Sequence, residues 1–549
     1  MDFKRLMIFF AIAAAILFGW QQMFPTPQPT PAQQQAAQET ATGAPTTASA
    51  TTPLTPTVPV TVTTDLIKAV IDERSGDLRD LTLLKYNSSS DETKDFVLLN
   101  DDQNHTYVAQ SQLLDAEGRN LLKDVTFTTP QKQYTLNGDK VEVRLSAPET
   151  AGLKIDKVYT FTKDSYLINI RYDVTNSSGQ PVKLDAVYSL LRDSNKPEGE
   201  GYFNHTYTGP VVYTPSGDFE KVPFDDLDDD FQSGKDEAEY VRRTNSGWVG
   251  MIQHYFMSTW ILQPKDGQSV CETGNCQIDL KRRGDNLYSA SVRVPMATVQ
   301  NGSTADFAMN LYAGPQTTDI ISNVADNLQL AKDYGKVHIF SSPLFWLLNK
   351  LHDIVGNWGW AIVLLTIIVK AVLYPLTNAS YRSMAKMRAV SPRLQALKEK
   401  YGDDRMAMQQ AMMQMYKEEK INPLGGCLPM LLQIPVFIGL YWAIFSSVEL
   451  RQAPWFGWIT DLSRPDPLFI LPIIMAITMF IQTHLNPPPA DPMQAKMMKI
   501  MPIIFSIMFF FFPAGLVIYW VVNNTLTILQ QWHINRSIAK QRAAGEVIS

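Results

Sequence analysis

Residues 357–376 read NWGWAIVLLTIIVKAVLYPL, an apolar stretch of 20 residues that contains a single charge, Lys370. This is the length that an α-helix needs to cross the hydrocarbon core of a bilayer. A charge near the middle of such a helix costs about 2.5–3.5 kcal/mol on insertion scales, so these residues usually face a polar cavity. No acidic residue in a predicted span can pair with Lys370, and we therefore expect it to be functional. The alternative is that its ammonium snorkels to the interface, about six residues away.

Further apolar stretches predict a helical membrane core around this segment. Its predicted spans are residues 357–376, 424–446, 468–485, 497–512 and 514–532. The last two are separated at Phe512-Pro513-Ala514-Gly515, because Pro followed by Gly is typical of a turn. Residues 1–24 carry Lys4 and Arg5 before an apolar run and lack a convincing cleavage site, which predicts an uncleaved N-terminal anchor.

Charge then predicts the topology. The positive-inside rule assigns Lys4, Arg5 and the segment 377–421, with nine Lys and Arg against five Asp and Glu, to the cytoplasm. The short basic tail, 533–549, is cytoplasmic only if the last two spans are separate. We therefore expect a multidomain membrane protein with six spans, five of them in the core, and both termini inside. The two split spans are short for a bilayer, which predicts local thinning.

Between the anchor and the core lies a region with strand periodicity. Residues 25–59 are rich in Pro, Thr, Ala and Gln and predict a flexible linker. From residue 60 to about 335, segments such as Leu167–Val174 alternate apolar and polar side chains, as half-buried strands do. Many such strands over this length predict a large all-β, two-sheet sandwich.

Three local features of this region give finer predictions. Asn137-Gly138 predicts the turn of a hairpin between residues 133–136 and 141–145. Residues 317–334 are expected to form a short amphipathic helix. The Asp-rich run 225–230 is expected to be a solvated loop.

Cysteine usage and charge restrict the chemistry of the sandwich. Cys271 and Cys276 flank Glu-Thr-Gly-Asn, which permits a disulfide in an oxidising compartment; free thiols or a two-ligand metal site are the alternatives, and no His or further Cys is close enough to complete a metal site. Residues 25–340 contain 28 Lys and Arg against 42 Asp and Glu, whereas the rest of the chain has 20 against 12. An acidic block argues against nucleic acid as a direct partner.

Two helical segments flank the first core span. Residues 341–356 have apolar side chains at helical spacing with Lys350 and Asp353 opposite, which predicts an amphipathic helix lying on the membrane surface. Residues 380–420 predict a hairpin of two polar helices, with a break near Pro392 and the turn at Gly402-Asp403-Asp404. Its second helix is rich in Met, and Met408 and Met412 are candidates for receiving varied apolar segments, although an ordinary helix seam gives the same pattern.

Polar side chains recur on several predicted spans. Thr366 lies four residues before Lys370 and shares its helix face. Gln433 lies on the second core span, and the last span contributes Tyr519, Trp520, Asn523, Asn524 and Thr527. These residues either line one polar cavity or act singly as hydrogen-bonding contacts between helices. No common hydrolase, metalloprotease or nucleotide-binding motif is present, so the sequence does not predict an enzyme.

Several motifs of the core together resemble the YidC/Oxa/Alb family of membrane protein insertases. They are VKAVLYPLT (369–377), SMAKMR (383–388), KINPLGGCLP (420–429), QIPVF (433–437), VELRQAP (448–454) and FPAGLVIYW (512–520). Their order, together with the long domain before them, resembles the Gram-negative members. In the family the cation of the groove is usually Arg, and Lys370 occupies that position here; Thr366, Tyr519 and Trp520 match substrate-contacting positions.

The resemblance implies a function without a nucleotide, metal or other cofactor. It implies an insertase for nascent membrane proteins of the bacterial inner membrane, with a β-supersandwich on the periplasmic side and a hydrophilic groove open to cytoplasm and lipid. It also implies action alone or with the Sec translocon (SecYEG and SecDF), weak ribosome contacts through cytoplasmic loops, and contact with membrane lipids. A membrane-tethered carbohydrate-binding domain and a transporter are the competing hypotheses.

Overall fold

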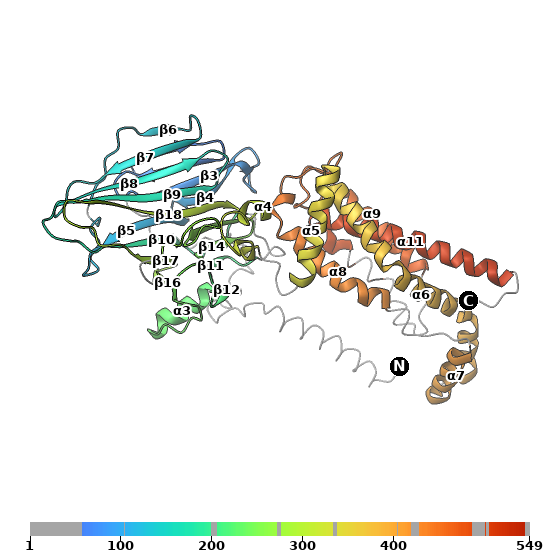
Figure 1. Cartoon of the computed structure of the whole chain (residues 1–549). Coiled ribbons are helices and arrows are strands. Elements are labelled where there is room, and N and C mark those ends of the chain that lie inside the picture. Colours follow the sequence, from blue (N-terminus) through green and yellow to red (C-terminus); the bar gives the residue numbers. More distant parts are fainter. Residues whose placement is uncertain are drawn as a thin grey trace. The chain divides into compact units, whose positions relative to one another are not determined.

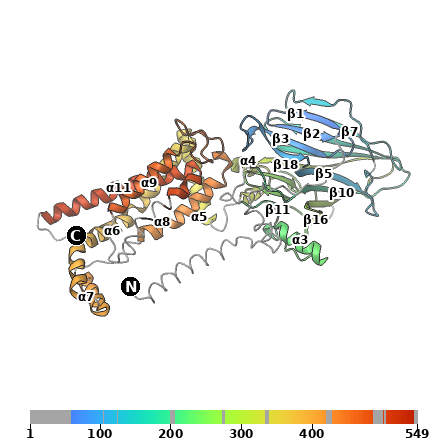
Figure 2. The same cartoon turned by 180° about the vertical axis from the view of Figure 1, so that it is seen from behind.

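The structure is a computed structural model that describes residues 58–103, 105–123, 125–198, 206–271, 276–332, 338–402, 404–418, 428–485, 500, 504 and 506–543. Contacts divide the chain into two compact units, one formed by residues 44–333 and one by residues 334–549 together with 1–43 (Figures 1 and 2). The predicted anchor, 1–24, and the predicted linker up to residue 57 lie outside the described residues.

The first unit contains two antiparallel-dominated sheets that together form a sandwich. The larger sheet has ten strands in the order β13 (Arg243–Thr244), β16 (Cys276–Gly284), β17 (Leu287–Pro295), β10 (Asp185–Arg192), β5 (Thr106–Leu114), β4 (Asp95–Asp101), β3 (Leu78–Asn87), β2 (Ile67–Asp72), β1 (Pro59–Thr63) and β6 (Gln133–Thr135). The smaller sheet has eight strands in the order β12 (Asp218–Lys221), β11 (Gly209–Thr214), β14 (Trp248–Gln253), β15 (Phe256–Ile261), β18 (Thr304–Pro315), β9 (Leu167–Asn176), β8 (Leu153–Thr162) and β7 (Lys140–Ser146).

The alternation in the sequence explains how the sheets meet. Along β9 every second side chain is buried, from Ile168 to Val174. Side chains from the two sheets then touch across the core: the hydroxyls of Ser111 on β5 and Tyr172 on β9 are 2.8 Å apart, and the rings of Tyr188 and Trp260 pack at 5.2 Å. The predicted two-sheet sandwich is therefore confirmed.

Three finer predictions for the sandwich are wrong. Strands β6 and β7 do not form a hairpin, because β6 pairs in parallel with β1 of the large sheet and β7 pairs with β8 of the small one. The Asp-rich run lies in a helix, α3 (Phe224–Ser233), whose Leu227 is buried and whose Asp228 pairs with Arg282. In place of one helix over 317–334 there are two short ones, α4 (Thr318–Ile321) and η2 (Leu328–Ala331).

A buried lysine marks the polar part of the sandwich core. Lys157 on β8 is fully buried, its Nζ lies over the rings of Tyr159 and Tyr172, and it has no hydrogen-bond partner among the described residues. Burial lowers its pKa from the usual 10.5 to about 8, an effect that nearby Asp77 partly opposes. Because the folded state favours the neutral amine, it binds fewer protons than the unfolded state between these two pKa values, and stability should rise with pH there.

This gives a prediction for the fragment 44–333. Raising the pH from about 7.5 to about 9 should increase its free energy of unfolding by about 1 kcal/mol through Lys157. Lys157→Met should remove this rise in urea titrations, whereas Lys154→Met, at an exposed position of the same strand, should keep it. An unchanged pH dependence in Lys157→Met would contradict the assignment.

The second unit is helical. Its described elements are α5 (His338–Val355), α6 (Trp358–Tyr401), α7 (Arg405–Glu418), α8 (Leu428–Phe445), η5 (Val448–Leu450), α9 (Ile470–Leu485), η6 (Phe509–Phe511) and α11 (Ala514–Ala543). Helix α5 ends where Gly356 adopts a positive φ of 67°, and Phe512 is extended between η6 and α11, at the break that the Pro-Ala-Gly sequence predicts. Of the predicted span 497–512, the structure describes residues 500, 504 and 506–512.

Helix α6 differs from the prediction. It continues for 44 residues through Pro375 and position 392, so the first predicted span and the first helix of the predicted hairpin are one helix. Pro375 lacks the N–H that would bond the Ala371 carbonyl, and prolines of this kind are tolerated in membrane helices where other groups satisfy the freed backbone. Helix α11 likewise continues to Ala543, past the predicted end of the last span at residue 532.

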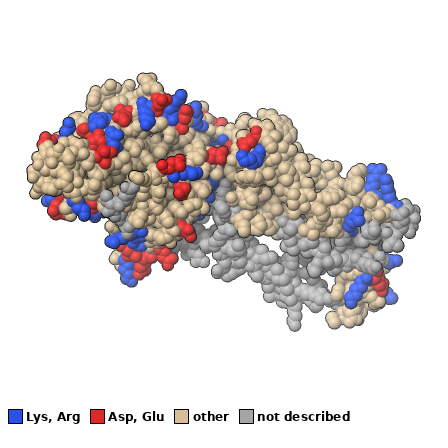
Figure 3. Space-filling model, in the orientation of Figure 1, with Lys and Arg blue, Asp and Glu red and all other residues tan. Residues whose placement is uncertain are grey.

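By length and composition, one helix among the described residues can cross a membrane, Trp358–Arg382, and Gln433–Phe445 and Ile470–Leu485 are shorter apolar helices. The face of this unit shown in Figure 3 is uncharged over a broad middle zone, with charged side chains toward its ends. The predicted spans 357–376, 424–446 and 468–485 overlap these three helices. Helix α11 is not among the apolar helices, because it carries several Asn and Gln residues.

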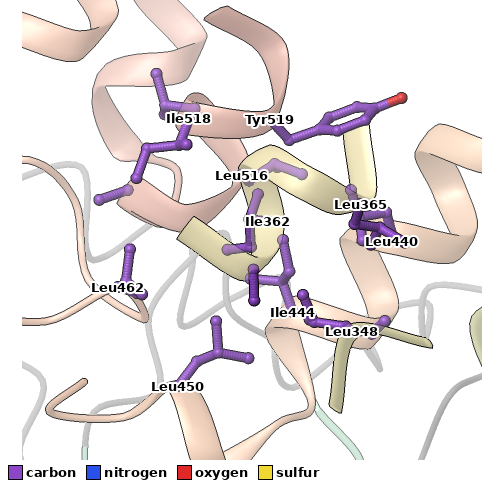
Figure 4. Close-up of a cluster of buried hydrophobic side chains, with 14 of the residues drawn as sticks. Leu348, Ile362, Leu365, Leu440, Ile444, Leu450, Leu462, Leu516, Ile518 and Tyr519 are labelled. Atoms are coloured by element: carbon purple, nitrogen blue, oxygen red, sulfur yellow. The ribbon is translucent and has the colours of Figure 1, made fainter. Parts of the chain in front are cut away.

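Helices α6 and α11 pack together in parallel. Near their N-terminal ends, Gly515 lies against Ile362; further along, Tyr381 packs with Ile534 and Ile538. The first contact belongs to an apolar core to which α5, α6, α8, α9 and α11 contribute, seen in Figure 4 with Leu348, Ile362, Leu440 and Leu516 among its members. Two apolar clusters thus lie at different heights along the same pair of helices.

The loop between α8 and α9 forms hydrogen bonds with the N-terminal end of α11. The backbone N–H groups of Ala514 and Gly515 donate to the carbonyls of Arg464 and Leu462, which satisfies the first turn of α11. Asp466, 1% exposed, accepts hydrogen bonds from the N–H groups of Leu468 and Leu471 and from the Trp458 indole. Its carboxylate therefore holds the start of α9 against the loop.

Candidate functional site

Between the two apolar clusters, α6 and α11 face each other with polar side chains. Lys370 of α6 is half-buried, and its Nζ donates to the hydroxyl Oγ1 of Thr527 on α11 at 2.7 Å. About two turns further along α6, Gln530 Nε2 donates to Thr377 Oγ1 at 3.2 Å. We call this set of residues, Lys370, Thr377, Asn523, Thr527 and Gln530, the polar seam.

The spacing of the residues on α11 accounts for the seam. Tyr519, Asn523 and Thr527 are four residues apart and therefore share one helix face. Asn523 is 3% exposed and Thr527 is 1% exposed, and the Thr527 hydroxyl donates to the Asn523 carbonyl at 2.8 Å. The neighbouring Asn524 points to another helix, because its Nδ2 donates to Thr478 of α9 at 3.4 Å.

Helix α8 adds one polar contact near the apolar core. Gln433 Nε2 and the Tyr519 hydroxyl are 3.5 Å apart, at the outer limit of a hydrogen bond. Figure 4 shows the Tyr519 hydroxyl directed away from the surrounding leucine and isoleucine side chains. The phenol therefore lies at the boundary between the apolar core and the polar side chains.

Two candidate residues do not join the seam directly. Thr366 is buried, and its hydroxyl donates to the Ile362 carbonyl of its own helix at 2.7 Å. Trp520 is half-buried among the rings of Phe437 and Phe509, at centroid distances of 5.1 and 5.7 Å. Among the described residues, neither makes a side-chain hydrogen bond to Lys370 or its neighbours.

The charge of Lys370 has no carboxylate partner within the part of the chain that the structure describes. The described ion pairs of this unit, such as Lys350–Asp353 and Arg464–Asp461, lie elsewhere. Thr527 is a neutral acceptor, so it positions the ammonium without cancelling its charge. The seam consequently presents a net positive charge inside an otherwise apolar bundle.

Sequence reasoning identified Lys370 but missed its partner. Thr527 was recognised only as one of several polar residues on the last span, because helix periodicity gives the face of α11 and not its vertical register against α6. The Gln530–Thr377 contact was missed for the same reason. The four-residue spacing of Tyr519, Asn523 and Thr527 is the sequence signal that limits the candidate partners of Lys370 to one face of α11.

At the far end of α6, a small cluster joins it to α7. Val390 and Met415 are buried together, with Leu397 and Tyr416 against them. A cleft of about 400 Å³ opens between the two helices, lined by Arg393, Leu397 and Lys400 on one side and Gln414, Met415 and Glu418 on the other. Met408 and Met412 are half-buried, while Met406 and Met413 are 70% and 53% exposed.

The cysteines and acidic groups of the sandwich give no further site. Cys271 and Cys276 form a disulfide, which is one of the alternatives that their spacing allows. Among the described residues, no three His, Cys, Asp or Glu side chains are grouped as metal ligands. The candidate site is therefore the polar seam with its neighbours Thr366, Gln433, Tyr519 and Trp520.

A large β-sandwich followed by an apolar helical unit with a positively charged seam defines a multidomain membrane protein. Residues 59–347 match the family described as YidC periplasmic domain, and residues 350–541 match that described as 60Kd inner membrane protein. The chain is 74% identical to the membrane protein insertase YidC of Neisseria gonorrhoeae over the full length of both chains, and 52% identical to that of Laribacter hongkongensis, also over both full lengths.

The chain therefore belongs to the YidC family of membrane protein insertases, which are not enzymes. Among solved structures, it is similar to an active YidC insertase with its first transmembrane domain resolved, at 18% identity and a TM-score of 0.40, covering 87% of this chain and 93% of that one.

Proposed function

We propose that this insertase of the bacterial inner membrane, whose sandwich is a periplasmic domain, uses the polar seam as the contact for polar segments of its clients. The observation that carries the proposal is the Lys370 ammonium, which is held at 2.7 Å by a neutral hydroxyl and has no carboxylate partner among the described residues. The clients are nascent membrane proteins.

The physical difficulty of insertion is the desolvation of polar groups. An unpaired backbone or side-chain polar group in hydrocarbon costs several kcal/mol. A hydrophilic groove that is open to cytoplasm and lipid and contains the seam lowers this cost for a short polar segment. The Lys370 charge attracts acidic residues of that segment, since Coulomb attraction is stronger where water is partly excluded.

The apolar part of the client supplies the driving force. Transfer of its hydrophobic span into lipid releases free energy in proportion to the apolar area that leaves water. No nucleotide is needed for this step. The apolar core near Tyr519, together with the Asp466-held loop, closes the end of the helix pair at which α6 and α11 begin.

The parallel packing of α6 and α11 supports a topology with six spans and both termini in the cytoplasm. Both helices pass from the Asp466-held loop toward the end that carries the basic hairpin, so residue 543 and α7 belong to the same side of the membrane. That side carries the excess of Lys and Arg and is cytoplasmic by the positive-inside rule.

The proposed partners follow from this arrangement. The insertase acts alone or with the Sec translocon (SecYEG and SecDF), and it contacts the ribosome weakly through its cytoplasmic loops. Helix α5 contacts membrane lipids at the interface: Trp346 and Ile354 are 63% and 78% exposed beside the Lys350–Asp353 ion pair, while Leu348 is buried against the core.

Lys370→Ala tests the role of the charge. In liposomes that contain the purified protein, insertion of a single-span client with an acidic translocated segment should fall about tenfold, the effect of about 1.4 kcal/mol. Lys370→Arg should retain insertion, and Lys350→Ala, which removes an exposed lysine of α5, should behave as wild type. Wild-type insertion by Lys370→Ala would contradict the proposal.

The topology is tested with a reporter fused after Ser549. External protease should leave this reporter intact in spheroplasts, because the basic tail is cytoplasmic, while it cleaves accessible sites in the sandwich of the same molecules. Cleavage of a folded reporter from outside would show that residues 500–522 form a single span.

We further propose that the hairpin, formed by the end of α6 and by α7, receives the client before the seam does. Cysteines at Met408 and Met412 should crosslink a ribosome-bound client at shorter chain lengths than cysteines at Thr366 or Tyr519. A cysteine at exposed Gln410 of α7 reports nonspecific crosslinking. Crosslinking at Thr366 and Tyr519 at shorter chain lengths than at Met408 and Met412 would contradict the proposal and leave the hairpin a structural role only.

A further inference from the structure

We infer that Thr527 is a positioning residue for insertion: its hydroxyl holds the Lys370 ammonium in place without neutralising it, so that the charge remains available to a client carboxylate. The inference rests on the proposed function of Lys370 and adds the group through which that lysine is oriented.

The hydrogen bonds of Thr527 fix the direction of its lone pairs. A hydroxyl has one proton to donate and two lone pairs that accept. The proton of Thr527 is donated to the Asn523 carbonyl at 2.8 Å, and the side chain is 1% exposed. Only an acceptor is therefore left toward Lys370, whose Nζ lies 2.7 Å away.

The lysine retains binding capacity in this arrangement. An ammonium has three donors, and among the described residues Thr527 uses one of them. Lys370 is half-buried, and its other two donors make no hydrogen bond among the described residues. Holding the flexible side chain in one orientation before the client arrives reduces the conformational entropy lost on binding.

The neutrality of the acceptor is the distinguishing feature. A carboxylate at position 527 would bind the ammonium more strongly, but it would also cancel the charge that attracts acidic clients. Threonine combines a fixed acceptor with zero charge. If Thr527 served only as packing between α6 and α11, its replacement would affect all clients alike.

The experiment uses the full-length purified protein in liposomes and two single-span clients that differ only in an acidic or a neutral translocated segment. Thr527→Val keeps the shape and removes the acceptor, Thr527→Ser restores it, and Thr527→Asp adds a charge. The matched control is Thr525→Val, because Thr525 is exposed on the same helix and its hydroxyl makes the same type of bond, to the Val521 carbonyl at 2.7 Å.

We expect Thr527→Val to reduce insertion of the acidic client roughly three- to tenfold, the range for losing one hydrogen bond inside a membrane protein, with little effect on the neutral client. Thr527→Ser should restore insertion of the acidic client, and Thr527→Asp should reduce it at least as much as Thr527→Val does. Thr525→Val should insert both clients as wild type does.

Equal losses for both clients, or wild-type insertion by Thr527→Val, would overturn the inference. If Thr527→Val does not accumulate, Thr527→Asp decides: selective loss of the acidic client supports the inference, and its absence contradicts it. Lys370→Ala is measured in parallel. Wild-type insertion of the acidic client by Lys370→Ala refutes the proposed function, whereas an impaired Lys370→Ala beside an unaffected Thr527→Val refutes only the role of Thr527.

Discussion

A lysine ammonium held by a threonine hydroxyl between two parallel helices is the contact around which the helical unit is organised. A charge within an apolar bundle is unfavourable unless polar groups or water surround it. The polar faces of α6 and α11 supply those groups over a limited height, and apolar clusters stabilise the helix pair above and below it. The bundle can therefore retain a charge at Lys370, because the two apolar clusters supply its packing energy.

Lys157 and Lys370 illustrate two solutions to the problem of placing a lysine inside an apolar region. Lys157 lies in the closed core of the sandwich, against aromatic rings and near Asp77, where burial lowers its pKa to about 8. Lys370 is only half-buried and lies in a seam of hydroxyls and amides. The first environment disfavours the charge, whereas the second positions it, and only the second is suited to attracting a client.

Sequence reasoning was reliable where the signal is local. Period-two alternation predicted the sandwich, the apolar run around Lys370 predicted a long apolar helix, and Phe512-Pro513 predicted the break before α11. It was wrong where distant pairing decides: β6 and β7 follow a good turn sequence, yet each gains more by pairing with a strand of a different sheet. A proline was also overrated as a helix break, because α6 continues through position 392. The partner of Lys370 depends on the register of two helices, and the sequence of either helix alone does not contain it.

The central claim is that the seam around Lys370 is a hydrated surface open to the cytoplasm. It is tested most directly by labelling single cysteines with a membrane-impermeant maleimide after Cys427→Ser removes the unpaired native thiol. In inverted membrane vesicles, Lys370→Cys and Gln530→Cys should be labelled, because both positions are half-buried. An arrested client with an acidic segment should block the reaction at Gln530→Cys, which keeps the lysine. Val372→Cys, whose position is 72% exposed and lies on the opposite face of α6 from Lys370, should remain unlabelled. Labelling of Lys370→Cys only from the periplasmic side, or no labelling from either side, would contradict the account.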